Sequence, residues 1–556
     1  MATDLEDLDA LAETAGRGSP LDIMTLAIDL WSRADALEIT HGDPATIRLQ
    51  RIYGTCLLAI LGARVNSALL LALSQLMKGK RYAAVAASGA ARMHRAGEEE
   101  QKLLAAVHDT IDAVYRNRFG QTFTSMADPL AEELLVTPVT FDAVEVDMMK
   151  IRDVKDPSLA ALYQHEYTVM QAAKLAQEAA AHAVFLDPPA VHAALDEETV
   201  LVDLCLIERD GPSALVASLW TRDSVRVAIR PLAAEWLLDR MRADGMRVRV
   251  SAVGRAVREA RKAFDPRGAQ EAPAAEEVTS ATIESVSDLL VGLLGEHLAQ
   301  FKAAGKRHLC IVPHGPFQVA PVHLLRIDGR PIADDWTVTV LPSLAFLLDG
   351  AQQPARSNAV AALGLDYRSA ATNPFGLHAL DDATREAAAI ARVFETDPII
   401  DERATERAFL DALEQCRFVH LAAHGRQNAV GPAFHVVYLA PEDRQDGLLF
   451  AHELLGRDLR GLEVVTLGAC ETALGRFDLA GNPWGFPATL LSLGASSVVG
   501  TLWDVRSPVA LTFFTTFYGR LGQGLRRRDA FAAAQRQTRT EHPAPGDWGA
   551  FVFMGR

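Results

Sequence analysis

Two short apolar runs, each ending in a reactive side chain, most constrain how this chain folds. The first, residues 418–425, carries His424, and the second, residues 462–473, carries Cys470, which follows His424 by 46 residues. Both runs are partly β-branched and stopped by small residues, so each is predicted to be a buried strand. A thiol at one strand end and an imidazole at a neighbouring strand end are the components of a cysteine nucleophile and its base.

The same segments carry a family resemblance. The motifs are His-Leu-Ala-Ala-His-Gly at 420–425, Gly-Ala-Cys-Glu-Thr-Ala at 468–473, Gly-Ala-Ser-Ser-Val-Val-Gly-Thr-Leu-Trp at 494–503 and Phe-Tyr-Gly-Arg-Leu-Gly-Gln-Gly at 517–524. In this order they resemble the CHAT family of caspase-like cysteine proteases, relatives of caspases and separases. Caspases also place the histidine first, about 50 residues before the cysteine. The resemblance implies a caspase-like α/β fold, peptide hydrolysis by a Cys–His dyad, and a role in prokaryotic signalling or immunity such as antiviral defence.

Composition narrows the partners and the compartment. The formal charge of −16 argues against nucleic acid as a direct partner, because phosphate binding needs a basic surface. The cysteines are odd in number and no two are separated by only two residues, so neither a disulfide framework nor a zinc ribbon is expected: Cys56, Cys205, Cys310, Cys416 and Cys470. We therefore expect a reducing, cytoplasmic compartment, no metal and no cofactor.

Neither the start of the chain nor its most apolar segment predicts membrane targeting. Residues 1–9 are acidic and lack a basic n-region, so no signal peptide is expected. The most apolar segment, 56–77, contains Arg64 and Asn66, which are costly in lipid. We interpret it as a buried helix rather than a membrane span.

Three regions are expected along the chain. Residues 1–195 have apolar residues at helical spacing but no convincing 34-residue repeat, which predicts an all-α bundle or degenerate helical repeats. Residues 196–350 are expected to form a pseudo-caspase-like half, with strands followed by helices at about 231–264 and 278–304. Residues 351–556 alternate strands with helices, which predicts a mostly parallel sheet and the catalytic half.

The predicted chemistry uses two residues at the carboxyl ends of their strands, where ligands of such sheets bind. Cys470 would attack as a thiolate, and His424 would accept its proton and later protonate the leaving amine. By the family pattern, the backbone N–H groups of Gly425 and Cys470 form the oxyanion hole. Taken alone, Cys470 would be interpreted as a core thiol, since cysteine is often fully buried. The spacing and flanking motifs favour catalysis.

Two further histidines in similar positions are interpreted as non-catalytic. On a strand, His420 shares a face with His424 but lies about 13 Å away, so the pair cannot hold one metal ion. His314-Gly315 repeats the His-Gly dipeptide, but no cysteine motif follows it before Cys416.

Substrate contacts are expected after the third motif. By resemblance to caspases, Thr501, Leu502 and Trp503 would lie beside the substrate and pair with its backbone. Trp503 is equally compatible with a pocket wall and with a core position. Asp504 would attract a basic P1 residue, or serve as a surface acid or helix cap.

We therefore expect a soluble cysteine endopeptidase that cleaves a partner protein. The helical domain is expected to contact a protein activator or sensor, and the sequence leaves the oligomeric state open. The alternatives are a non-enzymatic caspase-like scaffold, and a different hydrolase or acyltransferase acting through the same dyad.

Overall fold

The computed structural model describes most of the chain after residue 186 and little before it. The described residues are 56–57, 67–77, 187–207, 213–233, 236–241, 247–264, 275–347, 360–426, 435–442, 445–454, 457–468, 473, 476–477 and 483–556. The predicted helical domain, 1–195, therefore lies largely outside the described residues. Within it are the helices α4 (Ser67–Met77) and α10 (Pro188–Ala194). Among the described helices, none has both the length and the apolar character that crossing a bilayer requires.

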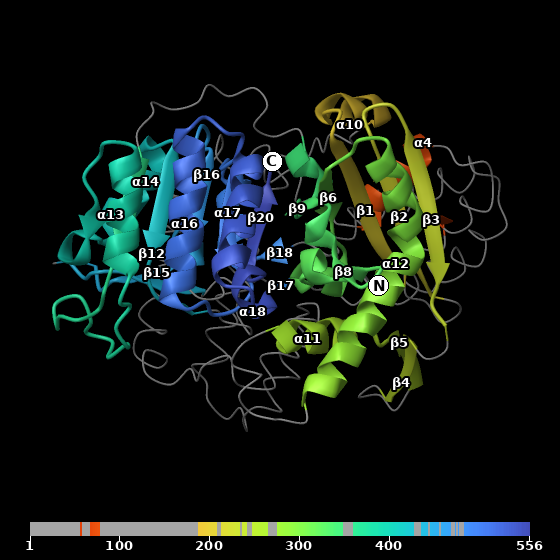
Figure 1. Cartoon of the computed structure of the whole chain (residues 1–556), viewed down its shortest axis with the longest axis horizontal. Coiled ribbons are helices and arrows are strands. Elements are labelled where there is room, and N and C mark those ends of the chain that lie inside the picture. Colours follow the sequence, from red (N-terminus) through yellow and green to blue (C-terminus); the bar gives the residue numbers. More distant parts are fainter. Residues whose placement is uncertain are drawn as a thin grey trace, which may run out of the picture.

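One central sheet of eleven strands runs through both predicted halves of the molecule (Figure 1). Its order is β11-β10-β12-β16-β19-β20-β9-β6-β1-β2-β3. The first half supplies β1 (Thr199–Ile207), β2 (Ala214–Trp220), β3 (Val225–Pro231), β6 (His308–Val312) and β9 (Thr337–Val340). The second half supplies β10 (Val360–Gly364), β11 (Ile399–Ile400), β12 (Phe418–Ala422), β16 (Val464–Leu467), β19 (Ser497–Thr501) and β20 (Phe551–Gly555). The mixed α/β class expected from the sequence is confirmed.

Strand direction reverses where the two halves meet. Strands β10, β12, β16 and β19 are mutually parallel, whereas β20 pairs antiparallel to β19 and parallel to β9. The β9–β20 pairing has a single register pair, Val340 with Met554. The carboxyl ends of β12, β16 and β19 therefore share one edge, and this edge is where His424 follows β12.

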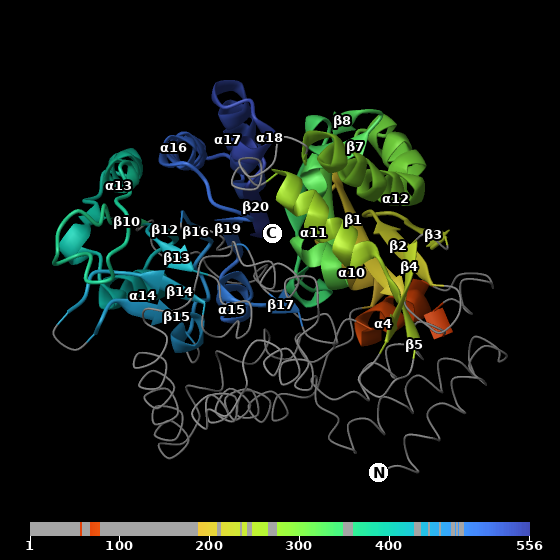
Figure 2. The ribbon, with the colours of Figure 1, turned by 90° about the horizontal axis from the view of Figure 1, so that it is seen from below.

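Helices cover both faces of the second half, as Figure 2 shows. On one face lie α13 (Ala383–Val393), α16 (Ser507–Gly522) and α17 (Arg527–Glu541), and on the other α14 (Glu406–Gln415) and α15 (Phe486–Ser492). In the first half, α12 (Ala275–Ala303) packs on β2 and β3 while α4 contacts β1. Every residue of β12, β16 and β19 is buried, which explains their continuous apolar runs.

An aromatic cluster fixes α16 and α17 to the sheet. The Phe513 ring stacks on Phe551 of β20 with centroids 3.7 Å apart, and meets Phe531 of α17 edge-on at 5.6 Å. Phe553 completes the contact from the same strand. Because β20 adjoins the first half, this cluster also holds the two halves of the sheet together.

Two elements differ from the sequence-based expectation. The predicted helix 231–264 is wrong in its first part, because Leu237–Met241 (β4) and Arg247–Ser251 (β5) form an antiparallel hairpin and only α11 (Val253–Phe264) is helical. Asp244-Gly245, a strong hairpin-turn dipeptide, separates the two strands in sequence. Strand β20 is the second difference, since no strand was predicted after residue 503.

Small elements complete the description. They are the sheet of β13 (Gly425–Arg426), β14 (Val436–Tyr438) and β15 (Leu448–Phe450), the pairs β17 (Arg476–Phe477) with β18 (Pro483–Trp484) and β7 (Arg326–Ile327) with β8 (Arg330–Pro331), and helix α18 (Pro545–Trp548).

Candidate active site

His424 is held rigidly two residues beyond the end of β12. Its side chain is 5% exposed. Its backbone N–H donates to the Tyr367 hydroxyl at 2.8 Å, and that hydroxyl donates to the Tyr438 carbonyl at 2.5 Å. The Tyr367 ring packs against the imidazole with centroids 4.7 Å apart. One tyrosine therefore fixes both the backbone and the ring plane of His424.

The hydrogen bonds of His424 define which ring nitrogen can act as a base. Nε2 lies 2.8 Å from the carbonyl oxygen of His378. A carbonyl can only accept, so Nε2 carries the hydrogen and the neutral ring has its lone pair on Nδ1. Within the described part of the chain, no group is hydrogen-bonded to Nδ1. The imidazole is thus anchored on one side and basic on the other.

Burial keeps this imidazole neutral. It lowers the pKa of His424 from 6.5 to about 4; the nearby His378 and Arg426 also lower it, while the His378 carbonyl and Asp504 raise it. At neutral pH the ring is therefore in the form that accepts a proton.

The loop that presents the His378 carbonyl is organised by Asn373. The Asn373 amide donates to the carbonyls of Tyr367 and Leu377 at 2.9 and 2.7 Å, and its side-chain oxygen accepts from the Leu377 N–H at 2.8 Å. These bonds close the loop directly before His378. The group that orients His424 is consequently built into the backbone.

Cys470 lies outside the described residues, but the ends of its segment are described. Gly468, just after β16, donates its N–H to the Leu421 carbonyl of β12 at 2.7 Å. On the other side, the Ala473 N–H donates to the Thr501 carbonyl at 3.0 Å. Both attachment points are at the carboxyl edge that carries His424. The distance between Cys470 and His424 stays a prediction.

The predicted oxyanion and substrate residues occupy different environments. Gly425 is half-buried and pairs with Val437 in the small β13–β14 ladder. Thr501 pairs with Phe551 of β20, and Leu502 donates its N–H to the Ala550 carbonyl at 2.9 Å. The main chain of Thr501 and Leu502 is thus already hydrogen-bonded within the protein.

Trp503 and Asp504, whose roles the sequence left open, differ in their surroundings. The Trp503 side chain is completely buried, donates from Nε1 to the Gly546 carbonyl at 2.7 Å, and stacks on Phe264 of α11. Asp504 is half-buried, and its charge acts on the His424 imidazole. The structure therefore brings Asp504, and not the Trp503 ring, to the histidine.

A buried polar chain lies beneath the turn after β16. His420, interpreted from the sequence as structural, is fully buried with Nδ1 2.7 Å from Thr466 Oγ1 and Nε2 2.9 Å from Glu386 Oε1. Thr466 Oγ1 lies 2.8 Å from the Tyr518 hydroxyl, which donates to the Val419 carbonyl at 3.0 Å.

The direction of this chain fixes where its protons lie. Tyr518 donates to a carbonyl, so it accepts from Thr466, and Thr466 in turn accepts from His420 Nδ1–H. One further proton is then shared between His420 Nε2 and Glu386 Oε1. Burial raises the pKa of Glu386, an effect that His420 opposes, which favours a protonated carboxyl donating to a neutral imidazole.

Gly468 connects this buried hydrogen-bonded series to the segment that carries Cys470. A Cβ on Gly468 would lie 3.1 Å from Glu386 Oε1 and 3.2 Å from the Leu421 carbonyl. The turn that leads to Cys470 therefore rests directly on Glu386. A side chain at this position would require Glu386 or the β12 main chain to shift by a few tenths of an ångström.

Sequence reasoning missed the groups that orient His424. Tyr367 and the His378 carbonyl come from a loop 46 to 57 residues earlier, with no motif linking them to the histidine. Glu386 lies on α13, where it would be interpreted as a surface acid of an amphipathic helix. Within the described residues, no group of three or more His, Cys, Asp or Glu side chains is spaced to hold a metal ion.

This architecture is a mixed α/β fold built on one central mixed sheet, with a neutral histidine at the carboxyl edge of its second half. The chain belongs to the CHAT domain family, which matches residues 273–556. The family expected from the motifs is confirmed.

Individual relatives are more distant. Tetratricopeptide repeat protein 28 from Homo sapiens is 24% identical over 211 residues, which cover 32% of this chain and 8% of that protein. The chain therefore spans less than a tenth of this relative.

Two solved structures are also similar in part. The Arg-specific cysteine proteinase gingipain R has a TM-score of 0.36 and 9% identity, over 50% of this chain and 68% of that one. Separase in the Saccharomyces cerevisiae separase–securin complex has a TM-score of 0.41 and 10% identity, over 97% of this chain and 37% of that one.

Proposed function

We propose that this chain is a caspase-like cysteine endopeptidase that cleaves a partner protein with a Cys470–His424 dyad. The observation that carries the proposal is the state of His424: its Nε2–H is anchored on a backbone carbonyl, and its Nδ1 is neutral. The attachment of Gly468 and Ala473 to the same sheet edge supports the placement of Cys470 beside it.

In the proposed reaction, His424 Nδ1 takes the proton of the Cys470 thiol as the sulfur attacks the substrate carbonyl carbon. The resulting oxyanion accepts hydrogen bonds from the N–H groups of Gly425 and Cys470. The C–N bond then breaks as the imidazolium returns its proton to the leaving amine. Water, deprotonated by His424, finally hydrolyses the thioester and releases the acid.

Asp504 has two proposed roles in this reaction. Its carboxylate acts on the His424 ring, so it stabilises the imidazolium that forms during attack. The same charge favours a basic P1 side chain in the substrate. Thr501, Leu502 and Trp503 remain the proposed substrate-binding segment, and a substrate strand would have to displace the present hydrogen bonds of Thr501 and Leu502 to pair with their main chain.

Activation is proposed to come through residues 1–195, where a protein activator or sensor binds. Helix α11 of the first half contacts the segment beside the site. Buried Arg261 of α11 donates to the Leu502 carbonyl at 2.7 Å, and Phe264 stacks on Trp503. A movement of α11 would therefore alter the main chain next to Asp504. The proposed setting is cytoplasmic prokaryotic immunity or signalling, for which family membership is the support.

The decisive experiment compares wild type with Cys470→Ala in a candidate partner proteome, with and without activator, by sequencing new peptide termini. Cys416→Ala is the matched control, since it removes a half-buried thiol elsewhere in the same half. New termini with wild type and Cys416→Ala, and none with Cys470→Ala, are expected. Identical termini in all three samples would overturn the proposal.

A non-enzymatic scaffold is the second candidate, and one observation favours it. The carbonyls of Thr501 and Leu502 already accept hydrogen bonds from Ala473 and Arg261, so the main chain proposed to pair with a substrate is engaged. A scaffold would pull down the same partners as wild type and Cys470→Ala while generating no termini with either.

A further inference from the structure

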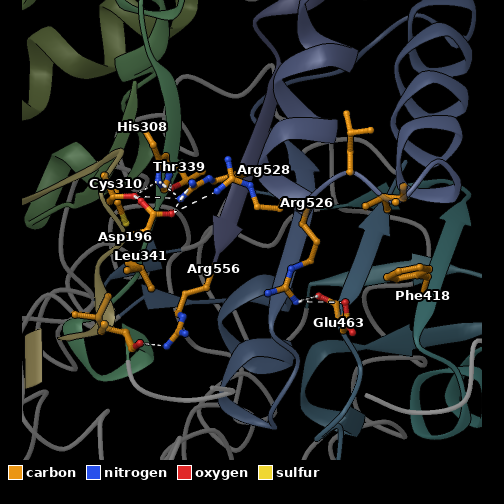
Figure 3. A pocket seen from close by; sticks show the side chains of 18 of the residues that line it. Asp196, His308, Cys310, Thr339, Leu341, Phe418, Glu463, Arg526, Arg528 and Arg556 are labelled. Atoms are coloured by element: carbon orange, nitrogen blue, oxygen red, sulfur yellow. Dashed lines mark hydrogen bonds and ion pairs between the residues drawn. The ribbon is translucent and has the colours of Figure 1, made fainter. Parts of the chain in front are cut away.

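The two ends of the paired strands β12 and β16 are contacted by different glutamates. At the amino ends, Glu463 accepts a two-bond fork from Arg417, at 2.8 and 3.2 Å. This pair is half-buried and lines a cavity of about 790 Å³ between the two halves of the sheet (Figure 3). At the carboxyl ends, which lead to His424 and to Cys470, the glutamate is Glu386 of α13, whose side chain is only 3% exposed.

One oxygen atom of Glu386 lies between the two segments that carry the proposed dyad. Oε1 is 2.9 Å from Nε2 of His420, which is on β12 four residues before His424. The same Oε1 is the atom nearest to the Cβ position of Gly468, at 3.1 Å, and Gly468 is two residues before Cys470. Glu386 therefore lies against both the strand of the proposed base and the turn of the proposed nucleophile.

Gly468 is confined on its other sides as well. Its N–H donates to the Leu421 carbonyl at 2.7 Å, and the same carbonyl lies 3.2 Å from its Cβ position. A ring carbon of Phe514 lies 3.3 Å from that position, and the Phe514 ring also packs on His420 with centroids 5.0 Å apart. Gly468 therefore occupies a tightly packed site of which Glu386 forms one wall.

Packing alone does not account for a glutamate at this position of α13. An apolar side chain would fill the site without the desolvation cost that a buried carboxyl carries. Burial raises the pKa of Glu386, while His420 lowers it and the charge of Asp382, the residue before α13, raises it further. A protonated carboxyl supports the turn without placing beneath it a negative charge, which would oppose ionisation of a thiol two residues farther along.

We propose that Glu386 is a positioning residue of the Cys470–His424 dyad, an inference that rests on the proposed function. Its carboxyl sets the spacing between β12 and the turn after β16, and therefore the distance over which the thiol proton passes to His424 Nδ1. Within the described part of the chain, the polar contacts of Glu386 do not include the proposed substrate-binding residues 501–504. Its loss should therefore lower kcat and leave KM unchanged.

The test measures kcat and KM per folded molecule for cleavage of the partner by the full chain. Glu386→Ala should lower kcat about tenfold to a hundredfold, because a displacement of 1 Å at a reacting group has an effect of this order. Glu386→Gln has the shape of the protonated carboxyl and can donate the same bond, so its kcat should stay within a few fold of wild type. Glu386→Asp withdraws the carboxyl by one methylene and should fall between the two, which covers the case in which Glu386→Ala does not fold.

Two controls separate positioning from loss of stability. Ile390→Ala truncates a completely buried side chain of the same helix, so it should destabilise the chain comparably while leaving Glu386 against Gly468. Glu463→Ala removes the glutamate at the amino ends of the same two strands. Both controls should keep kcat per folded molecule within a few fold of wild type. Unchanged kcat in Glu386→Ala, or an equal loss in Glu386→Ala and in either Ile390→Ala or Glu386→Gln, would overturn the proposal.

Hydrogen exchange distinguishes failure of this inference from failure of the proposed peptidase. The Gly468 and Ala473 amides each donate to a main-chain carbonyl, and measuring their exchange needs no substrate. Both amides should exchange faster in Glu386→Ala than in Ile390→Ala, and at about the wild-type rate in Glu386→Gln. If this pattern holds and the wild type cleaves nothing, the peptidase is excluded and the support of the turn by Glu386 remains. Equal exchange in Glu386→Ala and Ile390→Ala overturns the positioning role whether or not the chain cleaves a partner.

Discussion

The same dipeptide follows a central strand in each half of the sheet, and the two histidines are used differently. His314-Gly315 follows β6, and His424-Gly425 follows β12. His314 Nδ1 accepts the backbone N–H of Leu206 at 3.1 Å. His424 uses Nε2 to donate to a carbonyl and leaves Nδ1 without a described partner.

The difference shows that position alone does not make a histidine a base. In the first half, the lone pair on His314 Nδ1 accepts a hydrogen bond from the backbone N–H of Leu206 in β1. In the second half a carbonyl from a separate loop takes the ring hydrogen instead, which keeps the lone pair available. The proposed chemistry of His424 therefore depends on Tyr367 and on the loop that presents the His378 carbonyl.

The largest expected effect separates the two histidines by activity. His424→Ala should lower kcat/KM for the cleaved partner by about a thousandfold or more, because the general base and acid are lost together. Its thermal unfolding should change little by comparison. His314→Asn, whose side-chain oxygen can replace Nδ1 as acceptor, is the control and should retain activity within a few fold. Equal losses in both variants would remove the distinction between the halves.

The next effect tests the buried Glu386–His420 pair in the second half. Glu386→Ala should destabilise the chain by about 2–3 kcal/mol, because it leaves the buried His420 Nε2 without its hydrogen-bond partner. Glu386→Gln should cost less than about 1.5 kcal/mol if the pair is a protonated carboxyl donating to a neutral imidazole, since an amide can donate the same bond. Urea unfolding of both variants measures this, and equal large losses would indicate an ion pair instead.

The pH dependence of His424 follows from its lowered pKa. The base form persists down to about pH 4, so kcat/KM should hold from pH 7 to about pH 5 and fall below that. Between pH 6.5 and 4 the unfolded chain binds more protons than the folded one at this site. Stability should therefore decrease as pH falls through this window, by up to roughly 3 kcal/mol from His424.

His424→Asn is the control for this titration. Its stability profile should be flatter between pH 6.5 and 4, with the contribution of the same sign from His323, whose pKa is lowered by burial to about 4, still present. An activity profile that falls near pH 6.5 would show that His424 titrates as an ordinary exposed histidine.

Much of the fold was predictable because its signals are local. The strands ending near His314 and His424, helix α12 and the flanking helices of the second half follow from apolar runs and periodicity. The β4–β5 hairpin was missed although Asp244-Gly245 is a hairpin-turn dipeptide. Strand β20 was missed because Phe551–Gly555 is a short apolar run whose role, joining the halves between β19 and β9, depends on topology.

The candidate site was predictable only as a pair of motifs. His424 and its strand could be found from the dipeptide and its spacing. The hydrogen-bonding state of its ring could not, because it depends on a carbonyl in the main chain of residue 378, which has no sequence signature. Trp503 illustrates the same limit: the motif is equally compatible with a pocket wall and with the buried position against Phe264.

A smaller effect is expected when the side chain of His314 is truncated. His314→Ala should lower the free energy of unfolding by about 1–3 kcal/mol, since the Leu206 N–H loses its acceptor in a buried environment. His314→Asn should recover part of this loss. Activity per folded molecule should be unchanged in both, measured by peptide cleavage after correcting for the folded fraction. A specific loss of kcat in His314→Ala would mean that the first half takes part in the chemistry.

The smallest expected effect concerns Asp504, whose charge acts on His424 in the second half. Asp504→Asn removes a charge that raises the pKa of His424, so that pKa should fall and the imidazolium formed during attack should be less stable. We expect kcat for a neutral P1 substrate to fall only several fold, roughly 1 kcal/mol for a half-buried charge. A basic P1 substrate should lose more, because it loses its own partner as well. Equal losses for the two substrates would assign Asp504 to the histidine alone, and no loss for either would assign it to neither role.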